Sequence, residues 1–196
     1  MATNSASILL LSATFAAIGC SSSGANGVTA NPDDGSASDA SEADDGGSTD
    51  APYATLDITL PDINEDDFTL VSRTKDDLHI LCFWAVWCTP CQAELNKMMP
   101  MWEELKGRGL NVYAVSIDGP DSAARVPAYV QQSGWKFPIL LDRETAFLTR
   151  YQPNADVPFY VILDADGEIV KTHQGYVKGD MKTLHKYLDE KLPAAE

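Results

Sequence analysis

The sequence predicts one α/β domain, which begins near Tyr53 and continues toward the C-terminus. Short runs rich in β-branched and aromatic residues alternate there with longer amphipathic runs, which indicates strands alternating with helices. Residues 164–167, Asp-Ala-Asp-Gly, supply the turn chemistry of a β-hairpin, so the last two strands should be antiparallel neighbours. Earlier strands are joined through helices and should be parallel. We therefore expect a central mixed β-sheet flanked by helices on both faces.

The predicted strands are short runs in which apolar residues alternate with polar ones or follow one another directly. They cover residues 68–71, 78–85, 111–117, 139–142, 159–164 and 168–174. The predicted helices have apolar residues at helical spacing, and Gly107 and Gly109 should end the first of them. They cover residues 89–105, 121–133, 144–151 and 179–192.

The beginning of the chain is typical of an exported protein. Residues 8–18 form an apolar run that is too short to cross a bilayer as a helix but has the length of a signal-peptide core. The following Gly19-Cys20 resembles the end of a bacterial lipobox, in which the cysteine is lipidated and becomes the new N-terminus. We expect a lipoprotein-type signal peptide over residues 1–19 and lipidation of Cys20. The alternative is a plain secretory signal, with Cys20 an incidental free thiol.

Residues 20–52 should form an acidic disordered linker that leads to a folded domain over residues 53–196. The linker has no aromatic residue after Cys20 and cannot bury enough apolar area to offset the entropy of ordering. The chain has a formal charge of -15, and its first 72 residues hold 12 of its 29 acidic groups and no Lys or Arg. The remainder, with 17 acidic and 14 basic groups, has no strongly basic field, so we expect no nucleic-acid partner.

Cys88 and Cys91 lie where an apolar predicted strand passes into the first predicted helix. Unpaired N–H groups and the dipole at a helix start favour a thiolate, so Cys88 should have a lowered pKa and act as the nucleophile. Cys91, one helical turn later, should resolve the mixed disulfide that Cys88 forms with a partner. Pro90 suits the first turn of a helix. The alternatives are a static disulfide and half of a zinc site, although the chain has no second Cys-x-x-Cys pair.

Three segments carry a resemblance to a known family. They are residues 83–91, Phe-Trp-Ala-Val-Trp-Cys-Thr-Pro-Cys; residues 137–142, Phe-Pro-Ile-Leu-Leu-Asp; and residues 157–167, which begin Val-Pro and end Asp-Ala-Asp-Gly. Through them, the chain from about residue 55 to residue 192 resembles the thioredoxin superfamily, particularly the TlpA/ResA-like branch of extracytoplasmic bacterial thiol-disulfide oxidoreductases. The resemblance implies a thioredoxin fold.

The resemblance also implies a surface on which a partner binds. The bond between Val157 and Pro158 would be cis and face the cysteine pair, with its backbone offering an extended site to a partner peptide. A non-functional proline at the start of a strand is the alternative. Trp87 would line the surface around Cys88. The substrate-binding residues that we expect are Trp87, Thr89, Pro90, Val157 and Pro158.

Two further residues near the cysteine pair, Glu94 and Cys82, each allow two interpretations. Glu94 follows Cys91 by about one helical turn, where ResA-like proteins have a Glu near the active site. A partly desolvated Glu94 would have a raised pKa and could accept or relay a proton, whereas an ordinary exposed Glu early in a helix is the alternative. Cys82 occupies the place where thioredoxin has a buried Asp. Most buried lone cysteines are small core residues; the sharper hypothesis is that Cys82 exchanges with Cys91.

These residues predict a thiol-disulfide oxidoreductase that needs no metal and no cofactor besides the redox-active Cys88–Cys91 disulfide. The resemblance implies a reductase, because Thr-Pro lacks the His found between the cysteines of strongly oxidising relatives. Its substrates would be protein disulfides of exported proteins, for example in cytochrome c maturation. Its electrons would come from a membrane donor of the DsbD/CcdA type. We expect it in the bacterial cell envelope or periplasm, held at the membrane by a lipid anchor.

The predicted fold also supports two other kinds of function. A non-catalytic binding or metal-handling lipoprotein would use the cysteines only to hold structure or metal. Copper-chaperone relatives of the fold space their cysteines differently and add a His near the end of the domain, whereas His173 and His185 lie in no such motif. A peroxiredoxin-type peroxidase has a Thr three residues before its peroxide-attacking Cys, where this chain has Ala85. Local sequence therefore favours disulfide exchange.

Overall fold

The computed structural model describes residues 53–194. The predicted signal peptide at 1–19, the lipidation residue Cys20 and the acidic linker at 20–52 lie outside the described residues, as do residues 195–196. Between residues 53 and 194, no helix combines the length and the apolar character that crossing a membrane requires.

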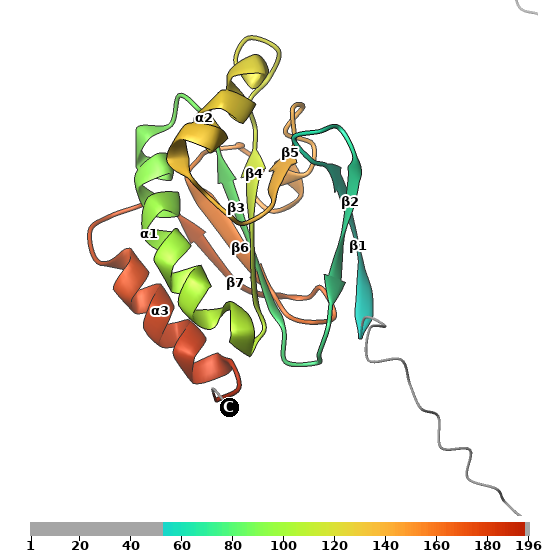
Figure 1. Cartoon of the computed structure of the whole chain (residues 1–196), viewed down its shortest axis with the longest axis vertical. Coiled ribbons are helices and arrows are strands. Elements are labelled where there is room, and N and C mark those ends of the chain that lie inside the picture. Colours follow the sequence, from blue (N-terminus) through green and yellow to red (C-terminus); the bar gives the residue numbers. More distant parts are fainter. Residues whose placement is uncertain (1–52, 195–196) are drawn as a thin grey trace, which may run out of the picture. The chain divides into compact units, whose positions relative to one another are not determined.

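A five-stranded sheet forms the centre of the domain, in the order β5-β4-β3-β6-β7 (Figure 1). Strand β3 pairs parallel with β4, and β4 pairs parallel with β5. Strand β6 runs antiparallel to both β3 and β7, and its connection to β7 is the predicted hairpin. The predicted mixed sheet is therefore confirmed. The strands span Leu78–Trp84 (β3), Leu110–Ser116 (β4), Ile139–Leu141 (β5), Phe159–Leu163 (β6) and Ile169–Gln174 (β7).

Different elements cover the two faces of this sheet (Figure 1). On one face, Cys82 of β3 contacts Met98 of α1, and Trp84 packs against Tyr129 of α2. Helix α3 lies beside α1 on that side. The other face is covered by the β1–β2 hairpin and by a segment that contains the short 3₁₀ helix η3. These elements span Thr89–Leu105 (α1), Val126–Ser133 (α2), Asp180–Lys191 (α3), Ala54–Pro61 (β1), Asp67–Ser72 (β2) and Leu148–Arg150 (η3).

Strand β1 was not among the predicted strands. Its sequence nevertheless carries the signal, because Leu56, Ile58 and Leu60 alternate with polar residues. Leu56 and Ile58 are buried, whereas Thr55, Asp57 and Thr59 are exposed, as in a strand with one face on a core. The pairing of β1 with β2 gives the domain a hairpin that the sequence prediction lacked.

The helix predicted over residues 144–151 is wrong, because only η3 forms there. Thr145 has a φ of 57°, in the left-handed region that an α-helix does not use. The carboxylate of Asp142 accepts the backbone N–H groups of Phe147 and Leu148, at 3.1 and 2.8 Å. These groups are therefore satisfied by a side chain instead of by helical carbonyls. The helix predicted over residues 121–133 is shorter than expected, since α2 begins at Val126 after a 3₁₀ turn.

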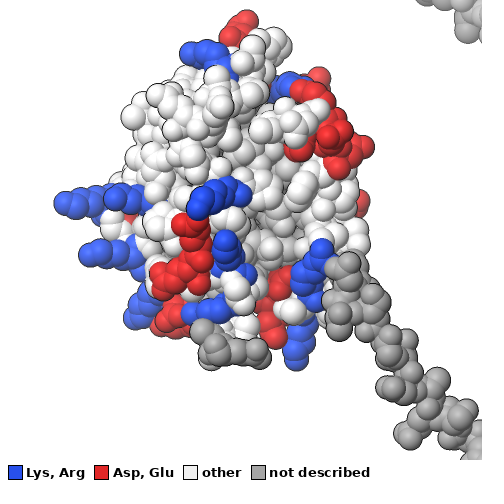
Figure 2. Space-filling view, viewed as in Figure 1, with Lys and Arg blue, Asp and Glu red and all other residues white. Residues whose placement is uncertain are grey.

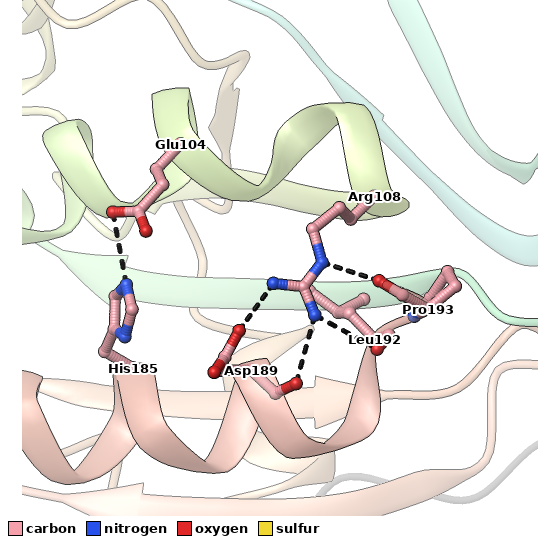
Figure 3. A network of polar contacts seen from close by, with 6 residues as sticks. All are labelled: Glu104, Arg108, His185, Asp189, Leu192 and Pro193. Carbon is pink, nitrogen blue, oxygen red and sulfur yellow. Dashed lines mark hydrogen bonds and ion pairs between the residues drawn. The ribbon is translucent and has the colours of Figure 1, made fainter. Parts of the chain in front are cut away.

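Hydrogen bonds and ion pairs hold the end of α3 against the end of α1 (Figure 3). Arg108, just after α1, donates to the carboxylate of Asp189 at 2.5 Å and to three backbone carbonyls near the end of α3. His185 lies 3.2 Å from Glu104 and forms a second link between the two helices. Because the last carbonyls of a helix lack helical partners, Arg108 also caps α3. The carbonyl acceptors belong to Asp189, Leu192 and Pro193.

Charges of both signs lie close together on the face shown in Figure 2. Basic and acidic side chains are interspersed over its lower part, whereas acidic side chains gather at its upper right. Ion pairs of the domain include Lys136 with Glu103 at 2.5 Å. Over the lower part of this face, opposite charges at such short range largely cancel each other's field at a distance.

His79, a fully buried residue of β3, joins the β1–β2 hairpin to the five-stranded sheet. The Ser72 hydroxyl donates to the carbonyl of Ala165 at 2.7 Å, so it must accept the Nε2–H of His79 at 2.9 Å. That leaves Nδ1 as an acceptor, and it faces the Tyr113 hydroxyl at 3.4 Å. Burial lowers the pKa of His79, against the opposing effects of Asp77 and Asp164. The hairpin is therefore attached to the sheet through a neutral imidazole.

We expect the free energy of unfolding to depend on pH through His79. Because its folded pKa lies below the value of about 6.5 in an unfolded chain, the unfolded chain binds the proton first as the pH falls. The stability that the neutral ring provides is present above pH 6.5 and is lost below it, with a slope of up to about 1.4 kcal/mol per pH unit. Urea unfolding between pH 5 and 7.5 should show this loss in the wild type relative to His79→Gln. Equal slopes for the wild type and His79→Gln would contradict the assignment.

Candidate active site

The cysteine pair lies at the N-terminus of α1. Cys88 is the N-cap residue of this helix, and its sulfur accepts the backbone N–H of Cys91 at 3.3 Å. Pro90 lies in the first helical turn, where an N–H group would have no helical acceptor. The remaining N–H groups of the turn and the helix dipole favour negative charge on the Cys88 sulfur. The local sequence thus produces the electrostatic setting of a reactive thiolate.

Cys88 and Cys91 form a disulfide, with their Cα atoms 5.3 Å apart. Cys91 is completely buried, whereas Cys88 is 5% exposed and borders the surface. Trp87, next to Cys88, is 59% exposed, and Thr89 and Pro90 are also exposed. The outer sulfur of the pair is therefore the one that a partner can approach.

Two side chains hold the loop that leads into the cysteine pair. The Asp118 carboxylate accepts the N–H of Val86 at 2.9 Å, and Gln92 donates to the Val86 carbonyl at 2.9 Å. Asp118 is itself buried and accepts the hydroxyls of Ser116 and Ser122. Sequence reasoning missed Asp118, although an acidic residue directly after a buried strand was a signal for such a role. Together these bonds fix the backbone two residues before Cys88.

Val157 and Pro158 lie at the same end of the sheet as the cysteine pair. The bond between them is cis, as the family resemblance implies. Phe159, the next residue, pairs with Phe83 near the end of β3, from which the chain runs into the cysteine loop. The Pro158 carbonyl accepts the N–H of Gly175 at 2.8 Å and the side-chain amide of Gln174 at 2.9 Å. Strand β7 therefore fixes the position of this proline.

Glu94 is buried, at 1% exposure, on the side of α1 that faces the sheet. Burial raises the pKa of its carboxyl to about 8, with a further contribution from the charge of Asp180. Its Oε1 atom has no hydrogen-bond partner. The alternative of an exposed Glu early in a helix is wrong for this residue. A carboxyl with this pKa is close in proton affinity to a thiol and can exchange a proton with one at little cost.

Cys82 is a free thiol beneath α1, completely buried in β3. Its sulfur lies 3.1 Å from the Met98 sulfur, to which the thiol donates. Burial and the nearby Glu94 raise the pKa of Cys82 well above that of an exposed thiol. A thiol that keeps its proton is a poor nucleophile. These properties favour the interpretation of Cys82 as a small core residue.

Other titratable side chains do not gather into a metal centre. Within residues 53–194, no three His, Cys, Asp or Glu side chains are placed so that they could hold a metal ion. His79 lies in the core against the hairpin, while His173 and His185 belong to β7 and α3.

Comparison with curated proteins finds relatives that are named for disulfide chemistry. The thiol-disulfide oxidoreductase ResA of Bacillus thuringiensis is 32% identical to this chain over 91 residues, which cover 46% of this chain. The aligned part spans about half of that relative, 51% of its length. A second ResA, from Halalkalibacterium halodurans, is 32% identical over 95 residues, which cover 48% of this chain and 52% of that protein.

Solved structures share the fold. A thioredoxin-like protein from Porphyromonas gingivalis is 28% identical, with a TM-score of 0.56 over 69% of this chain and 89% of that protein. The predicted thioredoxin fold is confirmed by this likeness and by the sheet order. The AhpC/TSA family matches residues 51–172, which is more than half of the chain and includes the cysteine pair and the cis-proline. The chain therefore belongs to the AhpC/TSA family, within the thioredoxin superfamily.

Proposed function

We propose that this protein is a thiol-disulfide oxidoreductase that reduces disulfides of other proteins through Cys88 and Cys91. The observation that carries the proposal is a disulfide at the N-terminus of α1 in which Cys88, 5% exposed, borders the surface while Cys91 is completely buried. The shared family and the naming of the ResA relatives as thiol-disulfide oxidoreductases support the same chemistry here.

The reaction begins from the reduced pair. The Cys88 thiolate attacks one sulfur of a partner's disulfide, and the partner's other sulfur leaves as a thiolate. Cys91 then gives up its proton and attacks the Cys88 sulfur. This step closes the Cys88–Cys91 disulfide and releases the partner's second sulfur, so two electrons have passed to the partner. A membrane donor of the DsbD/CcdA type would return two electrons to the pair.

Glu94 is the residue that we assign to the proton of Cys91. It follows Cys91 on α1 by about one turn, and its unpartnered Oε1 is available to a new donor. The raised pKa of Glu94 lets its carboxylate take the thiol proton near neutral or mildly alkaline pH and return it later. In this role Glu94 acts as general base for the resolving step.

In this proposal, a partner protein binds to the exposed residues around Cys88 and to the backbone before the cis-proline. Trp87 provides an apolar side chain at the surface, and Val157 is only partly buried. An extended peptide can pair with the free backbone groups at such a position. Thr89 and Pro90, exposed between the cysteines, complete this surface.

The setting that we propose is the bacterial cell envelope. A signal peptide over residues 1–19 and lipidation of Cys20 would hold the protein at a membrane, and residues 20–52 would act as the tether. The folded domain would then act on exported proteins, with cytochrome c maturation as one example. The resemblance of the chain to the TlpA/ResA-like extracytoplasmic branch supports this setting.

Removal of the nucleophile is the direct test of the proposed activity. We expect Cys88→Ala to lose essentially all catalysis of insulin reduction by dithiothreitol, because the surface thiolate is absent. Cys91→Ala should instead accumulate mixed disulfides with partners, since the resolving thiol is missing. Cys82→Ala removes the free cysteine of β3 and should keep the wild-type rate. Full activity in Cys88→Ala would refute the proposal.

The direction of electron flow follows from the reduction potential. For a reductase we expect a potential below roughly -200 mV, toward that of thioredoxin. Equilibration with glutathione or dithiothreitol redox buffers, followed by alkylation of free thiols, measures it. A potential above about -150 mV, in the range of strong oxidants, would reverse the direction and make the protein an oxidase of exported thiols.

Glu94→Gln keeps the size and most of the polarity of the side chain but cannot titrate. We expect this variant to slow resolution of the mixed disulfide by roughly 10²-fold, the usual scale of general-base catalysis. The pH profile of the wild-type rate should show a step near pH 8 that Glu94→Gln lacks. Stopped-flow measurement with a small disulfide from pH 6 to 9 tests this. Glu103→Gln, on the exposed side of α1, should keep the step; a step of unchanged size in Glu94→Gln would contradict the role.

A further inference from the structure

The most exposed large apolar side chain between residues 53 and 194 is that of Val177, at 66%. It belongs to the Val177 loop, residues 175–179, which joins β7 to α3 and projects outward from the domain (Figure 1). A single exposed apolar side chain is ordinary on a protein surface. Its location and the hold on its backbone therefore decide whether it has a use.

The Val177 loop begins against the cis-proline of the candidate active site. The N–H of Gly175 donates to the Pro158 carbonyl at 2.8 Å, and the side-chain amide of Gln174 donates to the same carbonyl at 2.9 Å. Successive Cα atoms are about 3.8 Å apart, so the Cα atom of Val177 lies within roughly 7.6 Å of that of Gly175. Val177 is thus close to the backbone that we assign to partner binding.

Both backbone polar groups of Val177 are bonded to Asp180, the first residue of α3. The Val177 N–H donates to the Asp180 carboxylate at 2.6 Å, and the Asp180 N–H donates to the Val177 carbonyl at 3.2 Å. The second of these bonds closes a four-residue turn, and the first adds a side-chain link across it. The backbone of Val177 is therefore fixed, although its side chain faces solvent.

The Asp180 carboxylate is itself attached to the sheet. Its Oδ2 atom lies 3.3 Å from Nε2 of His173 on β7. An ionised carboxylate can only accept, so Nε2 of His173 is the donor. The His173 ring stacks on the ring of Tyr160, which is almost completely buried, with the centroids 5.1 Å apart. The Val177 loop is therefore tied to the sheet at two places, through Pro158 and through His173.

An apolar side chain on a fixed backbone is a favourable contact for a partner. Ordering a loop on binding costs free energy, and a loop that is already held avoids that cost. Covering an apolar side chain with another one removes both from water. Trp87, next to Cys88, offers a surface of the same kind. The two most exposed large apolar side chains of residues 53–194 thus adjoin the surface cysteine and the cis-proline segment.

We propose that Val177 is a binding residue for the protein partner and packs against an apolar side chain close to the partner's cysteine. Asp180, held by His173, is the positioning residue that presents Val177. The inference rests on the proposed function and deepens it, because it names the substrate class as disulfides in extended segments with apolar flanking residues. The bonds that break and form are those of the exchange described above.

The test compares two disulfide substrates with the full chain. One is a synthetic peptide with an internal disulfide and a leucine on each side of one cysteine, and the other has serines in place of the leucines. The wild type should prefer the leucine peptide. Val177→Ser should lower the ratio of the two kcat/KM values roughly tenfold, the usual size of a lost apolar contact, whereas Val177→Ile should preserve the ratio. An unchanged ratio in Val177→Ser overturns the proposal.

Ile169→Ser is the matched control. Ile169 is 55% exposed on the same strand, but it lies at the start of β7, at the opposite end from Pro158. The ratio should keep its wild-type value in this variant. An equal fall in Ile169→Ser and Val177→Ser would reduce the effect to general surface hydrophobicity and overturn the proposal.

A double-mutant cycle tests the part of Asp180. Asp180→Ala removes the carboxylate that holds the Val177 N–H and should lower the same ratio roughly threefold or more. In a Val177→Ser background it should have no further effect, because no apolar side chain remains to be positioned. Asp180→Asn keeps an oxygen that can accept the N–H and should restore most of the ratio. An equal loss in both backgrounds overturns the positioning role; Val177→Ser alone tests the proposal if Asp180→Ala does not fold.

The same measurements separate this inference from the proposed function. A wild type that reduces neither peptide would refute the proposed function and the inference with it. Reduction of both peptides with a ratio that Val177→Ser leaves unchanged would refute the inference alone. Sedimentation of both proteins identifies the competing occupant: a wild-type dimer that dissociates in Val177→Ser, with an unchanged ratio, would assign Val177 to a contact between two copies of the chain and overturn the proposal.

Discussion

The complete burial of strand β3 is the constraint on which the rest of the domain depends. All seven of its residues are buried, because β4 and β6 pair with its two edges while helices and the hairpin cover its two faces. The chain can return to the surface only where this strand ends. Cys88 lies directly beyond that point, at the first turn of α1. The same burial places Cys82 and His79 in the interior, where their side chains point to opposite faces of the sheet.

Buried polar groups in the described part of the chain are mostly satisfied by close partners. Asp118 and Asp142 accept backbone N–H groups, and His79 is bonded on both sides of its ring. Two buried side-chain atoms between residues 53 and 194 lack a partner, Nε1 of Trp84 and Oε1 of Glu94. An unsatisfied buried polar group typically costs about 1–3 kcal/mol, so such groups tend to be retained where function needs them. The position of Glu94 close after the cysteine pair fits that reasoning.

The sequence predicted most of the sheet because apolar runs of strand length are separated by clear turn and helix signals. It also predicted the places of Cys88, Cys91 and Pro158, since the first two are set by helix geometry and the third by family resemblance. The prediction of a helix at residues 144–151 failed because the Asp142 side chain accepts two backbone N–H groups that would otherwise have bonded to helical carbonyls. A competition of this kind depends on where one carboxylate lies in three dimensions.

The contact between Asp180 and His173 was beyond prediction for a related reason. Asp180 begins α3, whereas His173 lies on β7, where it pairs with Tyr160 of β6. A slip of the β6–β7 register by one residue would turn the His173 ring to the opposite face of the sheet. Asp118 was hidden in the same way, because its role exists only once the end of β4 lies against the loop after β3.

The central strand also imposes an order on the assembly of the domain. Its neighbour β4 follows after a single helix, whereas its other neighbour β6 lies about 80 residues further along, as the pairing of Cys82 with Tyr160 shows. Contacts between distant segments form late, because the chain between them must first be ordered. Residues 88–105, which include both cysteines and α1, are also synthesised well before Pro158 and the strand β6 that follows it. In the newly made chain, the two thiols can therefore be oxidised before Pro158 and β6 have taken their places beside them.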